Sequence, residues 1–288
     1  MIFEHEIPTG SKLYFGKTAK LKRSLENQIS EILANDGYEE IVTPIFSYYQ
    51  HQSIEDETKL IKIADEANNQ ITLRADSTLD AVRIITKRLG RTTNHRKWFY
   101  VQPVFSYPNE EQNQIGCEWI EHDQVCDVVD LAVKIVNQLQ IEPVLQISNI
   151  NITKIISKQL KVDERIFQKG EVDKLFDMKL EWLDTLLWAN SIEDLENAKP
   201  KLPNFLKSEI EKLIDVASKI QYSNLVVAPL YHSSLKYYED IYFRFFEANE
   251  IIIKGGRYLS KNQNTENINS LGFAIYTDTL INFLEESK

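Results

Sequence analysis

The sequence has few cysteines and lacks a basic excess, and each shortage excludes a class of protein. It contains two cysteines, Cys117 and Cys126, in 288 residues. Two cysteines cannot build a disulfide framework, so we expect reduced thiols in a reducing compartment. Lysine and arginine number 33 against 43 aspartate and glutamate, a formal net charge of −10. This balance disfavours a mainly electrostatic grip on nucleic acid.

Long apolar runs are also missing. Residues 1–10 carry acidic residues and a proline where a signal peptide requires a basic and then an apolar run. No stretch approaches the roughly 18 apolar residues of a membrane span. We therefore expect a cytoplasmic protein with no membrane partner. At roughly 100–200 residues per domain, the length suits one large domain or two moderate ones.

The sequence offers no recognisable metal or cofactor motif. The closest grouping of cysteine and histidine, Cys117, His122 and Cys126, lacks the paired short spacings of a zinc site. There is no G-x-S-x-G elbow, phosphate loop or dinucleotide fingerprint, and Gly255-Gly256 followed by Arg257 is too short to match either glycine-rich motif. The sequence predicts neither a metal nor a cofactor.

What the sequence does contain is an alternation of helical and extended patterns in its first half. Leu21, Leu25, Ile29 and Leu33 recur at helical spacing and predict a helix over 17–36, with Gly37 as its left-handed cap. Strands are predicted over 38–44, 71–74, 98–105, 112–121 and 143–148, the third and fourth forming a hairpin with a longish loop. Helices are predicted over 77–90, capped by Ser77 and ended by Gly90, and over 125–139.

Residues 150–221 are helical by pattern throughout, and the cluster Trp182–Trp188 is either core or interface. Pro200 and Pro203 are expected at helix starts. Extended runs then return over 225–230, 237–246, 251–254 and 272–276, before a last helix. The pattern predicts an α+β fold with a mainly antiparallel sheet flanked by helices. Its core domain is expected to comprise 1–149 and 222–288, with 150–221 as a helical insertion.

Polar residues inside the predicted strands are the first functional candidates. Gln114, Gly116 and Glu118 recur at period two and therefore share one face of a strand. This face is either a solvated outer face or, since carboxylate and amide oxygens suit a cation, a site for an ammonium group.

Two other pairs of residues allow a structural and a functional interpretation. Arg74 and Asp76 straddle a strand-to-helix junction, where a surface salt bridge and an anion at a helix N-terminus are the simpler interpretation. Tyr237 and Tyr238 lie in an alternating strand, so only one of them can face inward. Packing is the simpler interpretation for this pair, and a pocket wall is the alternative.

Together these segments resemble the histidyl-tRNA synthetase family of class II synthetases. In their specific wording they are more similar to a non-catalytic branch, the regulatory subunits of ATP phosphoribosyltransferase. The segments are 38–44 (motif 1), 72–78 with 82–84 (an "LRADMT...ARI" wording), 104–118 (motif 2), 234–238 and 255–258 (two histidine-specific signatures), and 271–275 (motif 3). The resemblance implies a class II aminoacyl-tRNA synthetase-like core that dimerises through the motif 1 region.

Departures from the family pattern separate an enzyme from a regulatory relative. Activation of an amino acid displaces pyrophosphate at the α-phosphate of ATP and requires cations where negative charge develops. In this sequence Ser106 stands at the position of the motif 2 arginine. In the first histidine-specific signature, the arginine is replaced in the Ser233-Ser234 stretch and the aspartate by Lys236. In motif 3, the closing Glu-Arg pair reads Asp278-Thr279. The chain also ends soon after motif 3, so we expect no anticodon-binding domain and no nucleic-acid partner.

The resemblance also implies a ligand. Asp76, Gln114 and Glu118 match positions that hold the amino group of histidine, and Tyr237 and Tyr238 match positions around the imidazole. The implied protein is a non-catalytic regulatory subunit with no catalytic residues and no cofactor. It acts with the catalytic subunit of ATP phosphoribosyltransferase in the first step of histidine biosynthesis, with histidine as feedback effector. The alternatives are a truncated class II synthetase paralogue that activates an amino acid or modifies another molecule, and a binding module without ligand.

Overall fold

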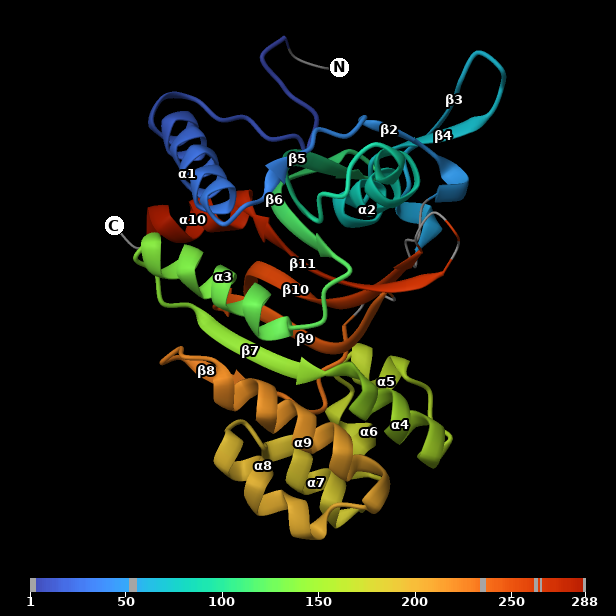
Figure 1. The fold of residues 1–288 in the computed structure, drawn as a ribbon, viewed down its shortest axis with the longest axis vertical. Coiled ribbons are helices and arrows are strands. Elements are labelled where there is room, and N and C mark those ends of the chain that lie inside the picture. Colours follow the sequence, from blue (N-terminus) through green and yellow to red (C-terminus); the bar gives the residue numbers. More distant parts are fainter. Residues whose placement is uncertain (1–3, 52–55, 234–236, 262–263, 265, 287–288) are drawn as a thin grey trace. The chain divides into compact units, whose positions relative to one another are not determined.

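The computed structural model describes residues 4–51, 56–233, 237–261, 264 and 266–286 (Figure 1). Its chain divides into two compact units, and both are discontinuous in sequence. Unit 1 comprises Met1–Glu121, Ser260–Ile268 and Ala274–Lys288, and unit 2 comprises His122–Leu259 and Asn269–Phe273. The described helices do not include one that is both long and apolar enough to cross a membrane.

Unit 1 is built from helices around an antiparallel hairpin. Its elements are α1 (Gly16–Asn35), β1 (Glu39–Glu40), β2 (Phe46–Tyr48), β3 (Lys62–Ala64), β4 (Gln70–Leu73), α2 (Ser77–Lys87), β5 (Lys97–Ser106), β6 (Glu110–Ile120) and α10 (Thr277–Glu286), with short 3-10 helices η1 (Tyr49–His51), η2 (Glu57–Lys59) and η3 (Leu89–Arg91). β5 and β6 pair antiparallel, β1 joins β5 in parallel, and β2-β4-β3 form a small antiparallel sheet. Helices α1, α2 and α10 pack on β6.

Unit 2 combines further strands with most of the helices. Its elements are α3 (Val125–Gln138), β7 (Val144–Asn149), α4 (Ile150–Leu160), α5 (Arg165–Gln168), α6 (Val172–Phe176), α7 (Glu181–Trp188), α8 (Ile192–Ala198), the 3-10 helix η4 (Lys199–Lys201), α9 (Asn204–Lys219), β8 (Leu225–Val227) and β9 (Tyr238–Glu247). β10 (Glu250–Lys261) and β11 (Asn267–Tyr276) contribute residues to both units. β9 pairs antiparallel with β7 and β10, and β8 pairs parallel with β7.

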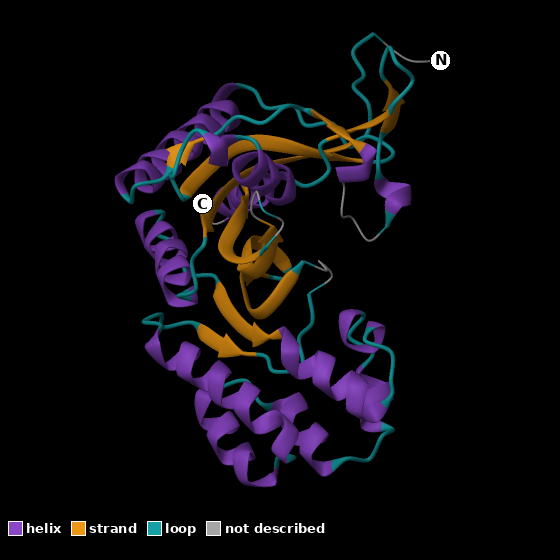
Figure 2. Ribbon diagram, turned by 45° about the vertical axis from the view of Figure 1, so that its right-hand side comes forward, coloured by secondary structure: helices purple, strands orange, loops and turns teal. Residues whose placement is uncertain are grey.

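The strongly periodic segments form where the sequence predicts them. α1 begins and ends within one residue of the predicted helix, and Gly37 ends it with φ +85°. Residues 150–219 contain helices and their connections only, drawn as one purple group in Figure 2. α9 packs there against α4, α8 and β7. The confirmed class is α+β with a mainly antiparallel sheet, whereas the division into core and insertion stays a prediction.

Several local predictions are wrong. The strand predicted over 38–44 is reduced to β1, because the Thr43 N–H donates to the buried side chain of Gln102 (3.2 Å) instead of to a backbone carbonyl of β5. The β5–β6 loop is short, running from Tyr107 to Asn109. α2 ends at Lys87, before Gly90. β10 runs on beyond the predicted 251–254 to Lys261.

The extension of β10 depends on Gly255 and Gly256. A Cβ on Gly255 would lie 2.5 Å from the carbonyl oxygen of Gly272, and one on Gly256 would lie 2.7 Å from that of Ile241. Neighbouring backbone therefore approaches so closely that only glycine fits. Gly255 and Gly256 follow the strand predicted over 251–254, and in the structure they lie in the interior of β10.

The apolar cluster in 182–188 divides between core and surface. Leu183 and Leu186 are buried, whereas the Trp188 side chain is 72% exposed and contacts the Phe176 ring, with centroids 6.1 Å apart. The core interpretation is therefore confirmed for Leu183 and Leu186, whereas an interface at Trp188 stays a prediction.

Candidate functional site

The polar face of β6 is buried. Gln114 and Glu118 are 9% and 0% exposed, so the solvated outer face considered from the sequence is excluded. Opposite Gly116 in the antiparallel register lies Tyr100 of β5. The Tyr100 hydroxyl donates to the Glu118 carboxylate (3.2 Å) and lies 3.1 Å from the Thr78 hydroxyl. Because its proton points to Glu118, Tyr100 accepts the hydrogen bond from Thr78.

Gly116 makes room for this arrangement. A Cβ built on it would lie 2.3 Å from both the ring carbon Cζ and the hydroxyl oxygen of Tyr100. Tyr100 itself is fully buried and cannot swing into solvent. Sequence reasoning missed Tyr100 and Thr78 as members of this network. A glycine inside a strand, which often marks a close approach of a neighbouring group, was the available signal.

Asp76 caps the helix that carries Thr78. Its carboxylate accepts a hydrogen bond from the Leu79 N–H (3.0 Å) at the start of α2. The expected anion at a helix N-terminus is confirmed, whereas the prediction that Ser77 caps this helix is wrong. Ser77 is the first helical residue and is buried. The contact of α2 with β5 and β6 thus brings together Asp76, Thr78, Tyr100 and Glu118.

Arg74 does not form the surface salt bridge considered from the sequence. The side chain is 1% exposed, and its guanidinium donates to backbone carbonyls of Pro103 (2.7 and 2.9 Å), Thr43 (3.0 Å) and Pro44 (3.1 Å). Burial lowers the pKa of this guanidinium, and the nearby Asp80 opposes that shift. Arg74 therefore ties the end of the motif 1 segment to β5.

Tyr237 and Tyr238 belong to unit 2. Tyr238 is 3% exposed and packs edge-on against Tyr242, with centroids 5.2 Å apart, while Tyr237 is half-buried with its ring 4.6 Å from that of Tyr238. The unequal burial agrees with the alternation expected for a strand. Ser234 and Lys236 lie outside the described residues. A role of either tyrosine in binding histidine stays a prediction.

The positions expected to hold ATP carry no cation in unit 1. The Ser106 hydroxyl, at the end of β5, donates to Glu110 (3.1 Å). Asp278, at the start of α10, is buried and accepts hydrogen bonds from the Asn113 N–H (2.8 Å), the Asn113 side-chain amide (3.1 Å) and the Tyr14 hydroxyl. Burial, followed by the Asp278 carboxylate, raises the pKa of Tyr14. This carboxylate joins three distant segments of the chain.

The fold and these sites define a class of protein, the class II synthetase-like proteins. The model of the family described as "Histidyl-tRNA synthetase" matches residues 14–280. A solved structure, described as an ATP phosphoribosyltransferase regulatory subunit/histidyl-tRNA synthetase from Bacillus halodurans, has the same fold with a TM-score of 0.86 at 18% identity. The similarity covers 98% of this chain and 84% of that one.

Two relatives named ATP phosphoribosyltransferase regulatory subunit are similar over nearly their whole length. The Wolinella succinogenes protein is 44% identical over 281 residues, covering 98% of this chain and 96% of that protein. The Helicobacter hepaticus protein is 41% identical over 284 residues, covering 99% of both. The chain therefore belongs to the histidyl-tRNA synthetase family, within the branch of the ATP phosphoribosyltransferase regulatory subunits.

Proposed function

We propose that this protein is the regulatory subunit of ATP phosphoribosyltransferase, acting with a separate short catalytic subunit in the first step of histidine biosynthesis. The observation that carries the proposal is the 44% identity over nearly the full length of a protein of that name. The subunit itself catalyses no reaction. Its role is to make the catalytic subunit active and to transmit inhibition by histidine.

The chemistry of the described site supports a non-catalytic role. An adenylating enzyme stabilises the charge that develops on the α-phosphate with cations, and loss of one such contact costs on the order of 10²-fold in rate. The Ser106 hydroxyl donates a hydrogen bond to Glu110, and Thr279 stands where the family pattern has the closing arginine. Neither position supplies a cation to a triphosphate.

Histidine is the proposed effector, and Asp76, Gln114 and Glu118 are its proposed ligands in unit 1. Glu118 is fully buried, so its carboxylate acts in a medium of low polarity where charge-assisted hydrogen bonds are strong. Tyr100 and Thr78 fix its orientation. Histidine can inhibit only if it binds one state of the complex better than another.

The motif 1 segment is the proposed surface of self-association. Val42, Ile45, Phe46 and Tyr48 follow β1 and expose large apolar side chains, Val42 to 78%. Exposed apolar clusters of this kind mark protein interfaces. A dimer formed through them would then dock catalytic subunits into a larger hetero-oligomer.

The test is co-purification with the catalytic subunit of the same organism, followed by a phosphoribosyltransferase assay with and without histidine. We expect the catalytic subunit to be active only in the complex and to be inhibited by histidine there. A catalytic subunit that is fully active and histidine-sensitive alone overturns the proposal. ATP–pyrophosphate exchange by the purified protein would instead favour the truncated synthetase.

Glu118→Gln tests the proposed histidine site within the same assay. It preserves the shape of the side chain and removes its charge, so the histidine concentration for half-inhibition should rise about 10- to 100-fold while activation is retained. Glu142→Gln, at an exposed position of unit 2, is the matched control and should leave inhibition unchanged. Unaltered inhibition in Glu118→Gln would exclude Glu118 as a ligand.

A further inference from the structure

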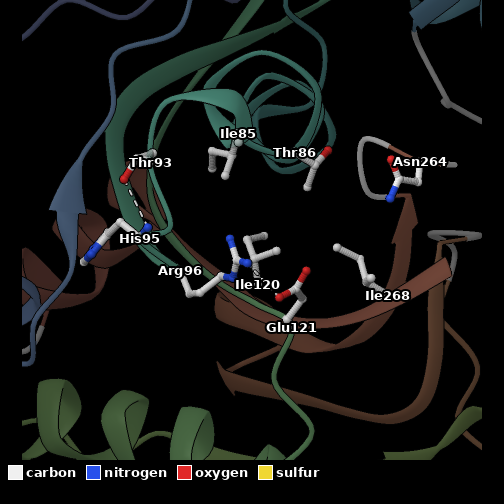
Figure 3. A pocket seen from close by; sticks show the side chains of 10 residues that line it. Ile85, Thr86, Thr93, His95, Arg96, Ile120, Glu121, Asn264 and Ile268 are labelled. Atoms are coloured by element: carbon white, nitrogen blue, oxygen red, sulfur yellow. Dashed lines mark hydrogen bonds and ion pairs between the residues drawn. The ribbon is translucent and has the colours of Figure 1, made fainter. Parts of the chain in front are cut away.

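A pocket lies in unit 1 where α2 and β6 end. It has a volume of about 180 Å³ and lies between the last turn of α2, the η3 segment and the end of β6 (Figure 3). Its lining consists of Ile85, Thr86, Gly90, Thr93, His95, Arg96, Ile120, Glu121, Asn264 and Ile268. The residues proposed above for histidine are not part of this lining.

Two opposite charges stand side by side in this lining. One guanidinium nitrogen of Arg96, Nη2, lies 2.9 Å from one carboxylate oxygen of Glu121, Oε2, and the two side chains are 39% and 41% exposed. An ion pair this exposed contributes little to folding stability, at most about 1 kcal/mol. The pair joins one nitrogen to one oxygen, which leaves the other oxygen of Glu121 and further N–H groups of Arg96 available to a ligand.

The backbone directs Glu121 to this place. It is the first residue after β6 and has φ +58°, a left-handed conformation that costs a non-glycine residue roughly 1–2 kcal/mol. The Arg96 carbonyl accepts a hydrogen bond from the Ile120 N–H (2.8 Å), so the two charged residues are held on adjoining backbone. The ion pair is therefore attached to a rigid part of the unit.

The remaining lining combines isoleucine side chains with polar groups. Ile85 and Ile120 are buried and form an aliphatic wall, and Figure 3 shows Ile268 on the same pocket. The His95 ring contacts the Lys97 carbonyl (2.6 Å) through one nitrogen and Glu39 (3.7 Å) through the other. His95 is thus occupied by its neighbours, and Arg96 and Glu121 supply the charges for a ligand.

We propose that this pocket binds a free α-amino acid with an aliphatic side chain. Its carboxylate pairs with Arg96, its ammonium group pairs with Glu121, and its side chain lies against the isoleucines. In an α-amino acid, the ammonium and carboxylate groups are attached to the same carbon atom. Their short separation matches that of the guanidinium of Arg96 and the carboxylate of Glu121, which form an ion pair. The pocket is smaller than the roughly 300 Å³ at which drug-sized sites begin, which suits a single amino acid. This proposal is independent of the proposed function.

The test is calorimetric titration of the full chain with L-leucine. Two matched probes lack one charge each: 4-methylpentanoate has no amino group and 3-methylbutylamine has no carboxylate. We expect saturable binding of L-leucine and at least tenfold weaker binding of either probe, because a charge-assisted hydrogen bond contributes about 1.5–3 kcal/mol. Absence of saturable L-leucine binding up to about 10 mM, or equal binding of all three molecules, overturns the proposal.

Arg96→Gln and Glu121→Gln should each weaken L-leucine at least tenfold, and Arg91→Gln, at an exposed position outside the pocket, should not. If the Arg96–Glu121 ion pair does not bind the ligand, L-leucine should bind Arg96→Gln and Glu121→Gln as it binds the wild type. This result would contradict the proposal. Binding of L-leucine should persist in Glu118→Gln. Failure of the histidine proposal and failure of this one are thereby distinguishable.

Discussion

The close approach of Tyr100 to Gly116 allows a quantitative prediction for Gly116→Ala. The new methyl group would lie 2.3 Å from ring atoms of a fully buried tyrosine, so the ring must move. Overpacking of this kind costs about 1–3 kcal/mol. Displacement of the Tyr100 hydroxyl from Glu118 and Thr78 adds about 1–3 kcal/mol. We expect a total loss of about 2–6 kcal/mol, visible in thermal unfolding as a decrease in Tm of about 4 °C or more.

A double-mutant cycle separates this clash from any general effect of alanine. Tyr100→Leu removes the ring atoms that the methyl group would meet, so Gly116→Ala in that background should cost less than about 1 kcal/mol. The coupling between the two positions is then at least about 1 kcal/mol. A small cost of Gly116→Ala in the wild-type background, or the same cost in both backgrounds, would refute the reasoning.

Three further predictions concern groups held by hydrogen bonds. Arg74→Lys should lower the free energy of unfolding in urea by about 2–4 kcal/mol, because lysine cannot reach three carbonyl groups at once. The control Arg91→Lys, at an exposed position, should change this free energy by less than about 0.5 kcal/mol. Equal effects of the two substitutions would contradict the role of Arg74. Asp278→Asn should cost about 1–3 kcal/mol, since the carboxylate accepts from both nitrogens of Asn113, and an unchanged Tm would exclude this. Burial, followed by the charges of two glutamates, raises the pKa of Tyr222 from 10.0 to about 12. The native state therefore keeps this proton longer than the unfolded state, and the contribution to stability is complete below pH 10 and disappears as the pH rises towards 12. An ultraviolet titration of Tyr222→Phe should lack one tyrosine that ionises near pH 12, and loss of one that ionises near pH 10 would contradict the assignment.

Much of the fold could be predicted because periodicity reports burial on one side of an element. Leu25, Ile29 and Leu33 lie at helical spacing, and all three are buried in α1. The wrong predictions concern short segments in which a single tertiary contact decides. Thr43 bonds to the Gln102 side chain, and Gly255 lies against the backbone of a neighbouring strand. Neither partner is close in sequence, so no local pattern could reveal it.

The candidate site could be predicted only in part for the same reason. Alternation placed Gln114 and Glu118 on one face of β6, but it could not say what covers that face, and the covering residues Tyr100 and Thr78 come from β5 and α2. A surface salt bridge is the simpler interpretation of Arg74 from the sequence, because the carbonyl groups that accept its hydrogen bonds become its neighbours only in the folded state.

The Asp278 carboxylate bears on the order in which the protein forms during synthesis. It holds Tyr14 and Asn113, which emerge from the ribosome more than a hundred residues before it. Unit 1 needs residues 274–286 for these contacts, whereas most of unit 2, His122–Leu259, is continuous. Domains generally fold as they are released, at roughly 5–20 residues per second. Most of unit 2 can therefore assemble before the last helix of unit 1 has been synthesised, so unit 1 begins the chain and yet is completed last.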